Sequence, residues 1–229
     1  MIPQIIHQVW EGKTEPLPVF LSELGKTWTE HNPEWRYEFW NYERMESFVL
    51  QYYPDFIDIY HGFRYDVQRW DVIRYMILYQ MGGLYVDFDY ECIESIDKYV
   101  VGKTCCFGVE PEEHAILFNK KYIISNAFML SIPRHPFIQR LLETVRNTNS
   151  LSDDKLVYVL ETTGPYMLSG VYENYEYKNE IDLFTAEMVS PLTKGEIARY
   201  IGGYVEGKDL DKKIQKAIAI HYYFGTWLR

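Results

Sequence analysis

Two aspartates separated by one residue are the first candidates for chemistry in this chain. Asp87 and Asp89 close the segment GGLYVDFD at 82–89, in which apolar residues alternate with Tyr85 and the two acids. On an extended strand this alternation predicts that both carboxylates point the same way, about 6.6 Å apart along the chain. Carboxylate oxygens suit Mg²⁺ or Mn²⁺, and a bound cation can neutralise a departing diphosphate. A pair of surface acids at a strand end would show the same spacing, so the motif alone does not decide.

The segment before it predicts a helix over residues 66–81 that carries an acid and a base. This helix is apolar almost all round, so Asp71 and Arg74 are expected to be largely buried. Buried charges need partners. They could pair with each other at i, i+3, or Arg74 could meet a phosphate or sugar hydroxyl and Asp71 a sugar or ribose hydroxyl. The glycine pair at 82–83 can supply the left-handed backbone that ends the helix.

Strand and helix patterns alternate along the rest of the chain, which predicts a single α/β domain over 1–229. Trp10 would end the first strand, where ligands meet parallel sheets. Strands are expected at 5–10, 36–40, 104–109, 123–132 and 217–223, and helices at 19–30, 43–52, 55–61, 136–146 and after the turn at 163–165.

Composition excludes several classes of function. The formal charge of −10, without a long basic run, disfavours nucleic acid as a partner. No leader pattern and no apolar stretch near the roughly 20 residues of a membrane span is present, so we expect a cytoplasmic protein without a transmembrane segment. Cys92, Cys105 and Cys106 form an odd set that favours free thiols, and no zinc-site spacing occurs. The 17% aromatic content favours core packing, but a sugar-stacking surface would also be rich in aromatic residues, so composition alone does not decide.

Two histidines have neighbours that invite a role. His221 lies on an apolar strand close to the end of the chain, where it could be a packed core residue or a third metal ligand. His7, in the first strand, is expected to be structural.

Taken together, these motifs resemble the DXD-containing family of sugar transferases, which includes fungal initiating α-mannosyltransferases, animal α-galactosyltransferases and bacterial surface-polysaccharide transferases. The catalytic domains of clostridial glucosylating toxins look like distant relatives. The resemblance spans nearly the whole chain, and its most specific block is WDVIRYMILYQMGGLYVDFD. The matching blocks lie at 2–12, 32–41, 70–89, 125–137, 162–168 and 219–227.

The resemblance implies a GT-A type, Rossmann-like sandwich with a mostly parallel central sheet flanked by helices, and a nucleotide-sugar donor. It implies that Trp10 stacks on the nucleobase and that Tyr85 lines the nucleotide pocket. Asp71 and Arg74 would hold the donor sugar and ribose. Asn126 would sit near the transferred sugar.

The resemblance also implies a divalent metal, Mn²⁺ or Mg²⁺. Asp87 would contact ribose and, through water, the metal, while Asp89 would bind the metal directly. The similar tail position in relatives strengthens His221 as a further metal ligand. His221, Thr226 and Trp227 would close over the diphosphate.

Two departures from the family bear on the expected enzyme. Trp70 stands where relatives often carry Ser, so the pocket could be narrower or the donor different. We expect the chain to lack the membrane anchor of eukaryotic members, which favours a bacterial-type enzyme in the cytoplasm and allows peripheral contact at the inner face of the membrane.

We therefore expect a metal-dependent, retaining hexosyltransferase of surface-polysaccharide synthesis, with a UDP-sugar favoured over a GDP-sugar and a saccharide or lipid-linked acceptor. Arg74 and the cation would stabilise the departing diphosphate during front-face attack. Glu110 is only a loose candidate for a nucleophile. The alternatives are a sugar nucleotidyltransferase, which should carry a glycine-rich basic loop after the first strand, and a non-catalytic carbohydrate-binding module.

Overall fold

The centre of the molecule is a six-stranded sheet in which every strand except one runs in the same direction. The structure is a computed structural model that describes residues 1–226, with the side chain of Asp209 left out. The strands are, in spatial order, β2 (Arg36–Trp40), β1 (Ile5–Val9), β3 (Gly83–Val86), β6 (Ile124–Ser131), β5 (Cys105–Val109) and β7 (Asp182–Phe184). Strand β6 alone is antiparallel to its neighbours, so the sheet is mostly parallel, as expected.

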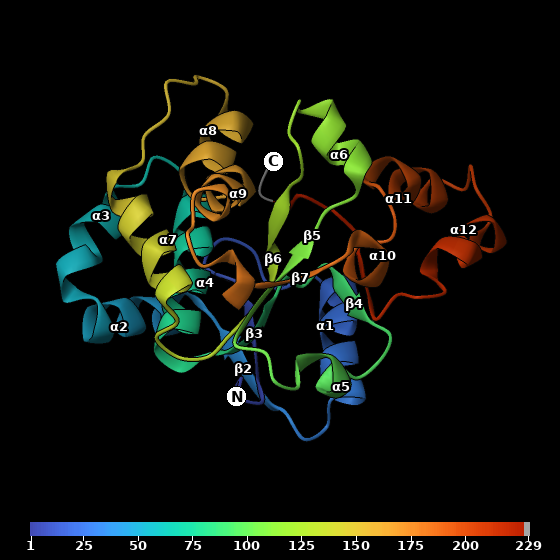
Figure 1. Cartoon of the computed structure of the whole chain (residues 1–229), viewed down its shortest axis with the longest axis horizontal. Coiled ribbons are helices and arrows are strands. Elements are labelled where there is room, and N and C mark those ends of the chain that lie inside the picture. The colour runs from blue at the N-terminus through green and yellow to red at the C-terminus, as the bar shows by residue number, and fades with distance from the viewer. Residues whose placement is uncertain (227–229) are drawn as a thin grey trace.

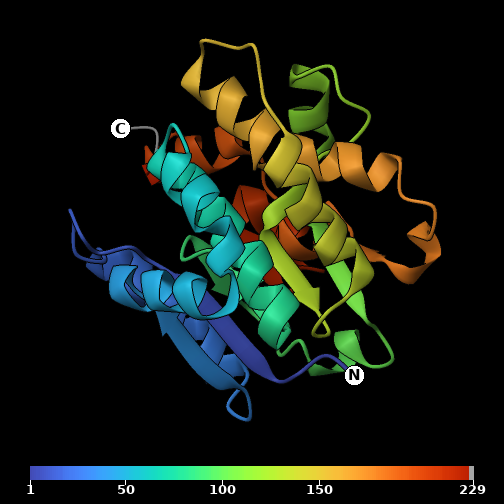
Figure 2. The same ribbon diagram turned by 90° about the vertical axis from the view of Figure 1, so that its left-hand side faces the viewer.

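Helices cover both faces of this sheet (Figures 1 and 2). One side carries α2 (Tyr42–Tyr52), α3 (Ile57–Gly62), α4 (Asp66–Met81), α7 (Pro136–Asn147) and α9 (Pro165–Glu173). The other side carries α1 (Val19–His31), α5 (Asp97–Val100), α10 (Ala186–Val189), α11 (Lys194–Ile201) and α12 (Gly207–Ile214). Helices α6 (Glu112–Leu117) and α8 (Lys155–Thr162) stand at the upper end in Figure 1, and the short 3₁₀ turns are η1 (Pro54–Phe56) and η2 (Lys178–Glu180).

The two layers have separate hydrophobic cores. Phe48, Tyr75 and Leu141 pack together on one face of the sheet. Trp28 and Val189 belong to the core on the other face. Alternate residues of the strands feed the two cores, which explains why the strands are apolar at nearly every position. No helix within residues 1–226 is long and apolar enough to cross a membrane.

Helix α4 matches the predicted range and burial. Every residue from Asp71 to Leu78 is buried, including both charged ones. The helix ends at Gly82, with φ +67°, and Gly83 follows with φ +102°. A Cβ atom at Gly83 would lie 2.6 Å from the Ile5 carbonyl oxygen, so only glycine fits the crossing from helix to sheet.

The prediction that one strand continues through both aspartates is wrong. Strand β3 ends at Val86, and the Tyr90 N–H donates back to the Asp87 carbonyl oxygen at 3.2 Å, which closes a turn. The chain then enters β4 (Tyr90–Cys92), which pairs with β8 (Ala219–His221) in a separate two-stranded sheet. Alternating polarity cannot reveal this switch, because it depends on a partner strand from the other end of the chain.

His7 is structural, as predicted. It is fully buried, and its Nε2 lies 2.9 Å from the Gly82 carbonyl oxygen while Nδ1 accepts from the Trp40 indole N–H at 3.2 Å. Because Nδ1 accepts, Nε2 carries the proton of the neutral ring. Burial lowers the pKa of His7 to about 4.

The cysteines are free, again as predicted. Cys92, Cys105 and Cys106 are all buried, and burial raises the pKa of the Cys92 and Cys106 thiols to about 12. They are therefore inert packing residues.

Candidate active site

A pocket opens where the parallel strands end. Trp10 follows β1, Asp87 follows β3 and Glu110 follows β5, and all three line it. Asn126 joins them because β6 runs in the opposite direction and begins at this edge. Ligands bind outside the carboxyl ends of strands in open α/β sheets, so the fold itself gathers the predicted residues here.

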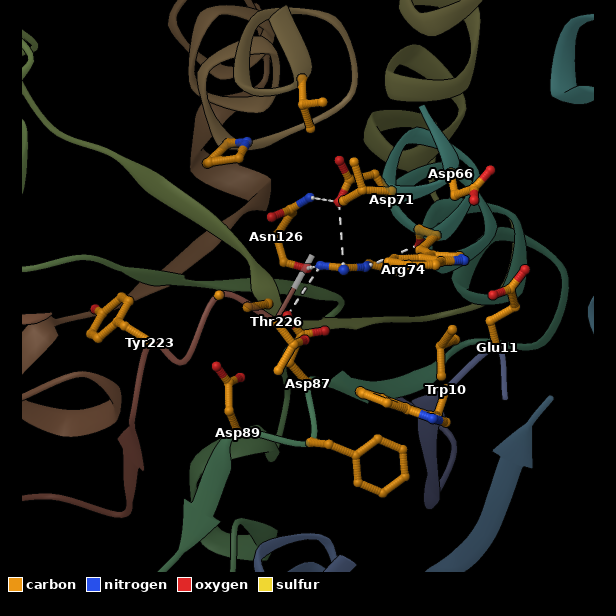
Figure 3. A pocket seen from close by; sticks show the side chains of 18 of the residues that line it. Trp10, Glu11, Asp66, Asp71, Arg74, Asp87, Asp89, Asn126, Tyr223 and Thr226 are labelled. Atoms are coloured by element: carbon orange, nitrogen blue, oxygen red, sulfur yellow. Dashed lines mark hydrogen bonds and ion pairs between the residues drawn. The ribbon is translucent and has the colours of Figure 1, made fainter. Parts of the chain in front are cut away.

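Arg74 lies at the centre of this pocket (Figure 3). Its Nη1 donates to Asp87 Oδ2 at 3.3 Å and to the Asn126 carbonyl oxygen at 3.2 Å, and its Nε donates to the Trp70 carbonyl oxygen at 3.1 Å. Its Nη2 lies 3.5 Å from Asp71 Oδ1. The guanidinium is thus fixed by two helix positions, the DXD turn and β6, and presents a positive charge to the cavity.

Asp71 holds other site residues in place. Its Oδ1 accepts from the Asn126 side-chain amide at 2.9 Å, and its Oδ2 accepts from the Thr163 hydroxyl at 2.8 Å. Burial raises the pKa of Asp71, while Arg74 and these two hydrogen bonds oppose the rise. The predicted pairing of Asp71 with Arg74 is present, but it is one contact in a larger network. Thr163, which the sequence marked only as part of a turn, belongs to that network.

Asp87 is held through both of its oxygens. The Tyr85 hydroxyl donates to Oδ1 at 2.5 Å, and Arg74 donates to Oδ2. Burial raises the pKa of Asp87, and Arg74 opposes that rise. Burial lowers the pKa of Arg74, but Asp87 and its other neighbours outweigh this and raise it, so the base stays charged. Because both carboxylate oxygens of Asp87 already accept hydrogen bonds, we expect Asp87 to contact a cation through a water molecule rather than directly.

Asp89 faces the C-terminal part of the chain. Its Oδ1 lies 3.2 Å from His221 Nε2, and its Oδ2 accepts from the Phe224 N–H at 3.0 Å. Burial tends to raise the pKa of Asp89, but His221 and the Phe224 N–H outweigh it and lower the pKa. Figure 3 shows the Asp87 and Asp89 carboxylates extending into the same cavity. The expected common direction is therefore present, although a turn produces it.

His221 has the surroundings of a rigid ligand. Its ring stacks on Tyr90 with centroids 4.2 Å apart and an interplanar angle of 11°. The ring also packs against Tyr223, at 3.8 Å. These contacts fix the plane of the imidazole, so Nε2 is directed at Asp89.

These residues fit a divalent cation. In this structure His221 Nε2 and Asp89 Oδ1 contact each other directly at 3.2 Å. Neighbouring ligand atoms in octahedral coordination with bonds of about 2.1 Å lie about 3 Å apart, so a cation could replace this contact with little movement of either side chain. Among residues 1–226, no three His, Cys, Asp or Glu side chains are grouped to hold a metal ion by themselves. A cation at Asp89 and His221 would therefore need oxygens from water and from a substrate diphosphate, as Mg²⁺ sites commonly do.

Trp10 and Thr226 line the pocket, as the donor-site prediction requires. The Trp10 indole N–H donates to the Glu15 carbonyl oxygen at 2.9 Å, which orients its ring beside the cavity. Trp227, the other predicted tail residue, lies outside the described residues.

Glu110 lies at the far side of the pocket in an arrangement that the sequence did not reveal. His114 Nδ1 lies 2.9 Å from Glu110 Oε2, and the Lys194 backbone N–H donates to His114 Nε2 at 3.0 Å. Because Nε2 accepts, Nδ1 carries the proton of the neutral ring and donates to Glu110. Tyr223 packs against His114 at 4.9 Å and has φ +51°, a strained value for a side chain of this size.

Comparison with known proteins agrees with this geometry. Residues 18–107 match the family described as "Glycosyltransferase sugar-binding region containing DXD motif". The chain is 30% identical over 181 residues to mannosyl phosphorylinositol ceramide synthase SUR1 of Saccharomyces cerevisiae, covering 77% of this chain and 43% of that protein. It is 30% identical over 177 residues to inositol phosphoceramide mannosyltransferase 2 of Schizosaccharomyces pombe, covering 77% of this chain and 48% of that one.

The chain thus spans less than half the length of these two curated relatives. A shorter match, 31% identical over 101 residues, joins 44% of this chain to 40% of the uncharacterized glycosyltransferase L373 of Acanthamoeba polyphaga mimivirus. These relatives come from yeasts and a virus, so they give no support to the bacterial type that we expected.

Solved structures establish the fold. PaToxG glycosyltransferase superposes with a TM-score of 0.55 at 13% identity, covering 94% of this chain and 84% of that one. Mouse xyloside xylosyltransferase 1 gives a TM-score of 0.53 at 10% identity and 98% coverage of both chains. The expected GT-A fold is confirmed. The chain carries, on this fold, the sugar-binding region of the DXD-containing glycosyltransferase family.

Proposed function

We propose that this chain transfers a hexose from a nucleotide diphosphate sugar to an acceptor hydroxyl, with retention of anomeric configuration and with Mn²⁺ or Mg²⁺ bound at Asp89 and His221. The observation that carries the proposal is the 3.2 Å approach of these two ligand atoms in a pocket that Arg74 also lines. A divalent cation and a guanidinium at one site can together stabilise the two charges of the bound diphosphate and the third charge that develops as it leaves.

The side chains divide the work. Asp89 and His221 would hold the cation, which would neutralise charge on the leaving group. Arg74, kept in place by two carboxylates, would donate to the donor. Asn126 would present its amide to the sugar, since its own orientation is fixed by Asp71. Trp10 would offer its ring face to the nucleobase.

Retention is proposed through front-face attack, in which the acceptor hydroxyl approaches from the side of the leaving group. Glu110 is the alternative nucleophile, but its Oε2 is engaged by His114, which suits a positioning role better. A Glu110→Gln variant that keeps the ability to transfer sugar would support front-face attack. Trapping of a glycosyl-enzyme on Glu110 would refute it.

The donor and acceptor are proposed by chemical class. The two yeast relatives named above act, by their names, in mannose transfer to phosphorylinositol ceramides. We therefore propose a nucleotide-linked mannose as a candidate donor, in addition to the UDP-sugars that the sequence favours. The proposed acceptor is lipid-linked or a saccharide. Cytoplasmic location, with contact at the inner face of a membrane, remains a proposal from the sequence.

A panel of UDP- and GDP-sugars tests the donor. Binding at 100 times Kd should stabilise the fold by about 2.7 kcal/mol, which a thermal shift detects. Stabilisation that requires Mn²⁺ and the nucleotide together supports a transferase. A protein that responds to the free sugar alone would instead be a carbohydrate-binding module.

Asp89→Asn tests the metal assignment. We expect it to abolish Mn²⁺-dependent transfer and donor hydrolysis, because the amide cannot replace a charged ligand. Asp58→Asn, at an exposed position on α3, is the matched control and should keep parent activity. Equal activity of Asp89→Asn and the parent would refute the assignment of Asp89 as a metal ligand.

A further inference from the structure

Helix α6 ends in a group of apolar side chains that are exposed to solvent. Ile116, Leu117 and Phe118 are 68%, 75% and 40% exposed. Lys120 and Lys121 follow within the same turn of chain and are also exposed. We call residues 116–121 the α6 tip. Single exposed apolar residues are common, but three in succession beside two lysines form a patch.

The α6 tip is held in shape by its backbone. The Lys120 N–H donates to the Ala115 carbonyl oxygen at 2.8 Å, and the Asn119 N–H donates to the Ile116 carbonyl oxygen at 3.0 Å. Asn119 takes φ +52°, the left-handed value that ends a helix. Ala115 is buried and anchors this turn. The exposed apolar side chains are therefore displayed on a formed turn.

The α6 tip stands beside the mouth of the pocket. Glu110, which lines the pocket, lies just before α6 in the chain. Tyr166 lies next to Pro165 of the pocket wall, and both Phe118, at 5.6 Å, and Lys120, at 4.9 Å, contact its ring. Figures 1 and 2 agree that α6 and the loop before α8 project from the same end of the molecule.

A second segment at that end also carries an exposed apolar residue. Leu151, in the loop between α7 and α8, is 99% exposed. Lys155, Leu156 and Leu160 of α8 line the pocket. Exposed apolar residues thus occur in both segments at this end of the molecule, three at the α6 tip and Leu151 in the loop before α8.

We propose that the α6 tip docks on a lipid surface that bears anionic head groups, and so holds the pocket against the membrane. Charge selects this occupant: the chain carries a net −10, yet Lys120 and Lys121 stand at the apolar end of α6, while Glu112 and Glu113 occupy its first turn. Apolar insertion and lysine attraction to anionic lipid are the two forces that bind interfacial segments.

The docking surface deepens the proposed function, because it would give the site access to a lipid-linked acceptor. It does not depend on the donor chemistry. Donor hydrolysis in solution uses the pocket alone, so its behaviour separates failure of the docking surface from failure of the proposed transferase.

Vesicle co-sedimentation tests the docking surface. Parent protein should bind vesicles of phosphatidylcholine with phosphatidylserine and bind weakly to phosphatidylcholine alone. Lys120→Gln with Lys121→Gln should weaken binding to the anionic vesicles by about fivefold per lysine. Ile116→Ser with Leu117→Ser should weaken binding to both. Tyr204→Ser, at an 82% exposed position between α11 and α12, is the matched control and should bind like the parent.

Donor hydrolysis without vesicles should be unchanged in all these variants, which shows that they are folded. The docking surface is refuted if the parent does not bind anionic vesicles, or if the serine variant binds as well as the parent. Self-association of the parent that the serine variant loses, without vesicle binding, would instead assign the patch to a second copy of the chain.

Discussion

Replacing Arg74 by methionine offers a quantitative test of the buried charge network. The Arg74 side chain is 10% exposed and lies 3.5 Å from Asp71 and 3.3 Å from Asp87. Methionine fills part of the space but leaves the buried Asp71 and the partly buried Asp87 without their cation. Breaking one buried ion pair from one side costs about 3–5 kcal/mol, so we expect a loss of about this size in the free energy of unfolding at pH 7.

The pH dependence of this loss follows from the carboxylates. Burial raises the pKa of both Asp71 and Asp87 even while Arg74 is present, and removing Arg74 would raise each further. A carboxylate with a raised folded-state pKa destabilises the folded state above its unfolded pKa, and the penalty is lost as pH falls through the folded pKa. The deficit of Arg74→Met should therefore shrink as the pH is lowered from 7 toward the unfolded-state pKa of an aspartate, about 3.9.

Urea unfolding followed by tryptophan fluorescence across this pH range measures these quantities. Arg69→Met is the matched control on the same helix, because Arg69 pairs with the 58% exposed Asp66 and should lose only about 0–1 kcal/mol. Adding Asp87→Asn to Arg74→Met should restore part of the stability. A loss for Arg74→Met no larger than for Arg69→Met, at every pH, would refute the reasoning.

Two further predictions concern the parts of the fold that carry the site. Burial lowers the pKa of His7 to about 4, so between pH 6.5 and pH 4 the His7 side chain is protonated in the unfolded chain but neutral in the folded one. Stability should thus fall by about 3 kcal/mol as pH drops from 6.5 to 4, and a His7→Gln variant should lack this part of the dependence in urea titrations. Gly83→Ala should cost more than about 2 kcal/mol, because φ is +102° and the new Cβ would meet a β1 carbonyl oxygen at 2.6 Å. Gly102→Ala, at φ +76° in open space, should cost clearly less, and equal melting temperatures for the two variants would contradict the steric argument.

Local pattern was enough to predict the helix that leads into the site. The run from Asp71 to Leu78 is apolar on nearly every face, which only a buried helix explains, and the glycine pair fixed its end. The partners of Asp71 could not be predicted in this way. Asn126 and Thr163 reach it from β6 and from the end of α8, and nothing in the sequence around any of the three records that meeting.

The structure of the DXD segment could not be predicted from the sequence, because it depends on which strands pair with each other. The alternation through Asp87 and Asp89 continues past the end of β3, so the sequence favours one strand where the structure has a turn and a change of sheet. The smaller elements α5, α6, α8, β7 and α10 to α12 were also missed. They are short, and their stability comes from packing against distant segments, which single-sequence periodicity does not report.

The proposed metal site and the C-terminal segment are built by the same contacts. Register pairs Tyr90 with His221, the Asp89 carbonyl oxygen accepts from the Tyr222 N–H at 2.8 Å, and Asp89 Oδ2 accepts from the Phe224 N–H. A cation that draws Asp89 and His221 together must therefore favour this position of the tail. By linkage, contacts that hold the tail must raise the affinity for the cation by the same factor. Cation binding and the docking of residues 221–224 against Asp89 and Tyr90 would then be a single coupled equilibrium.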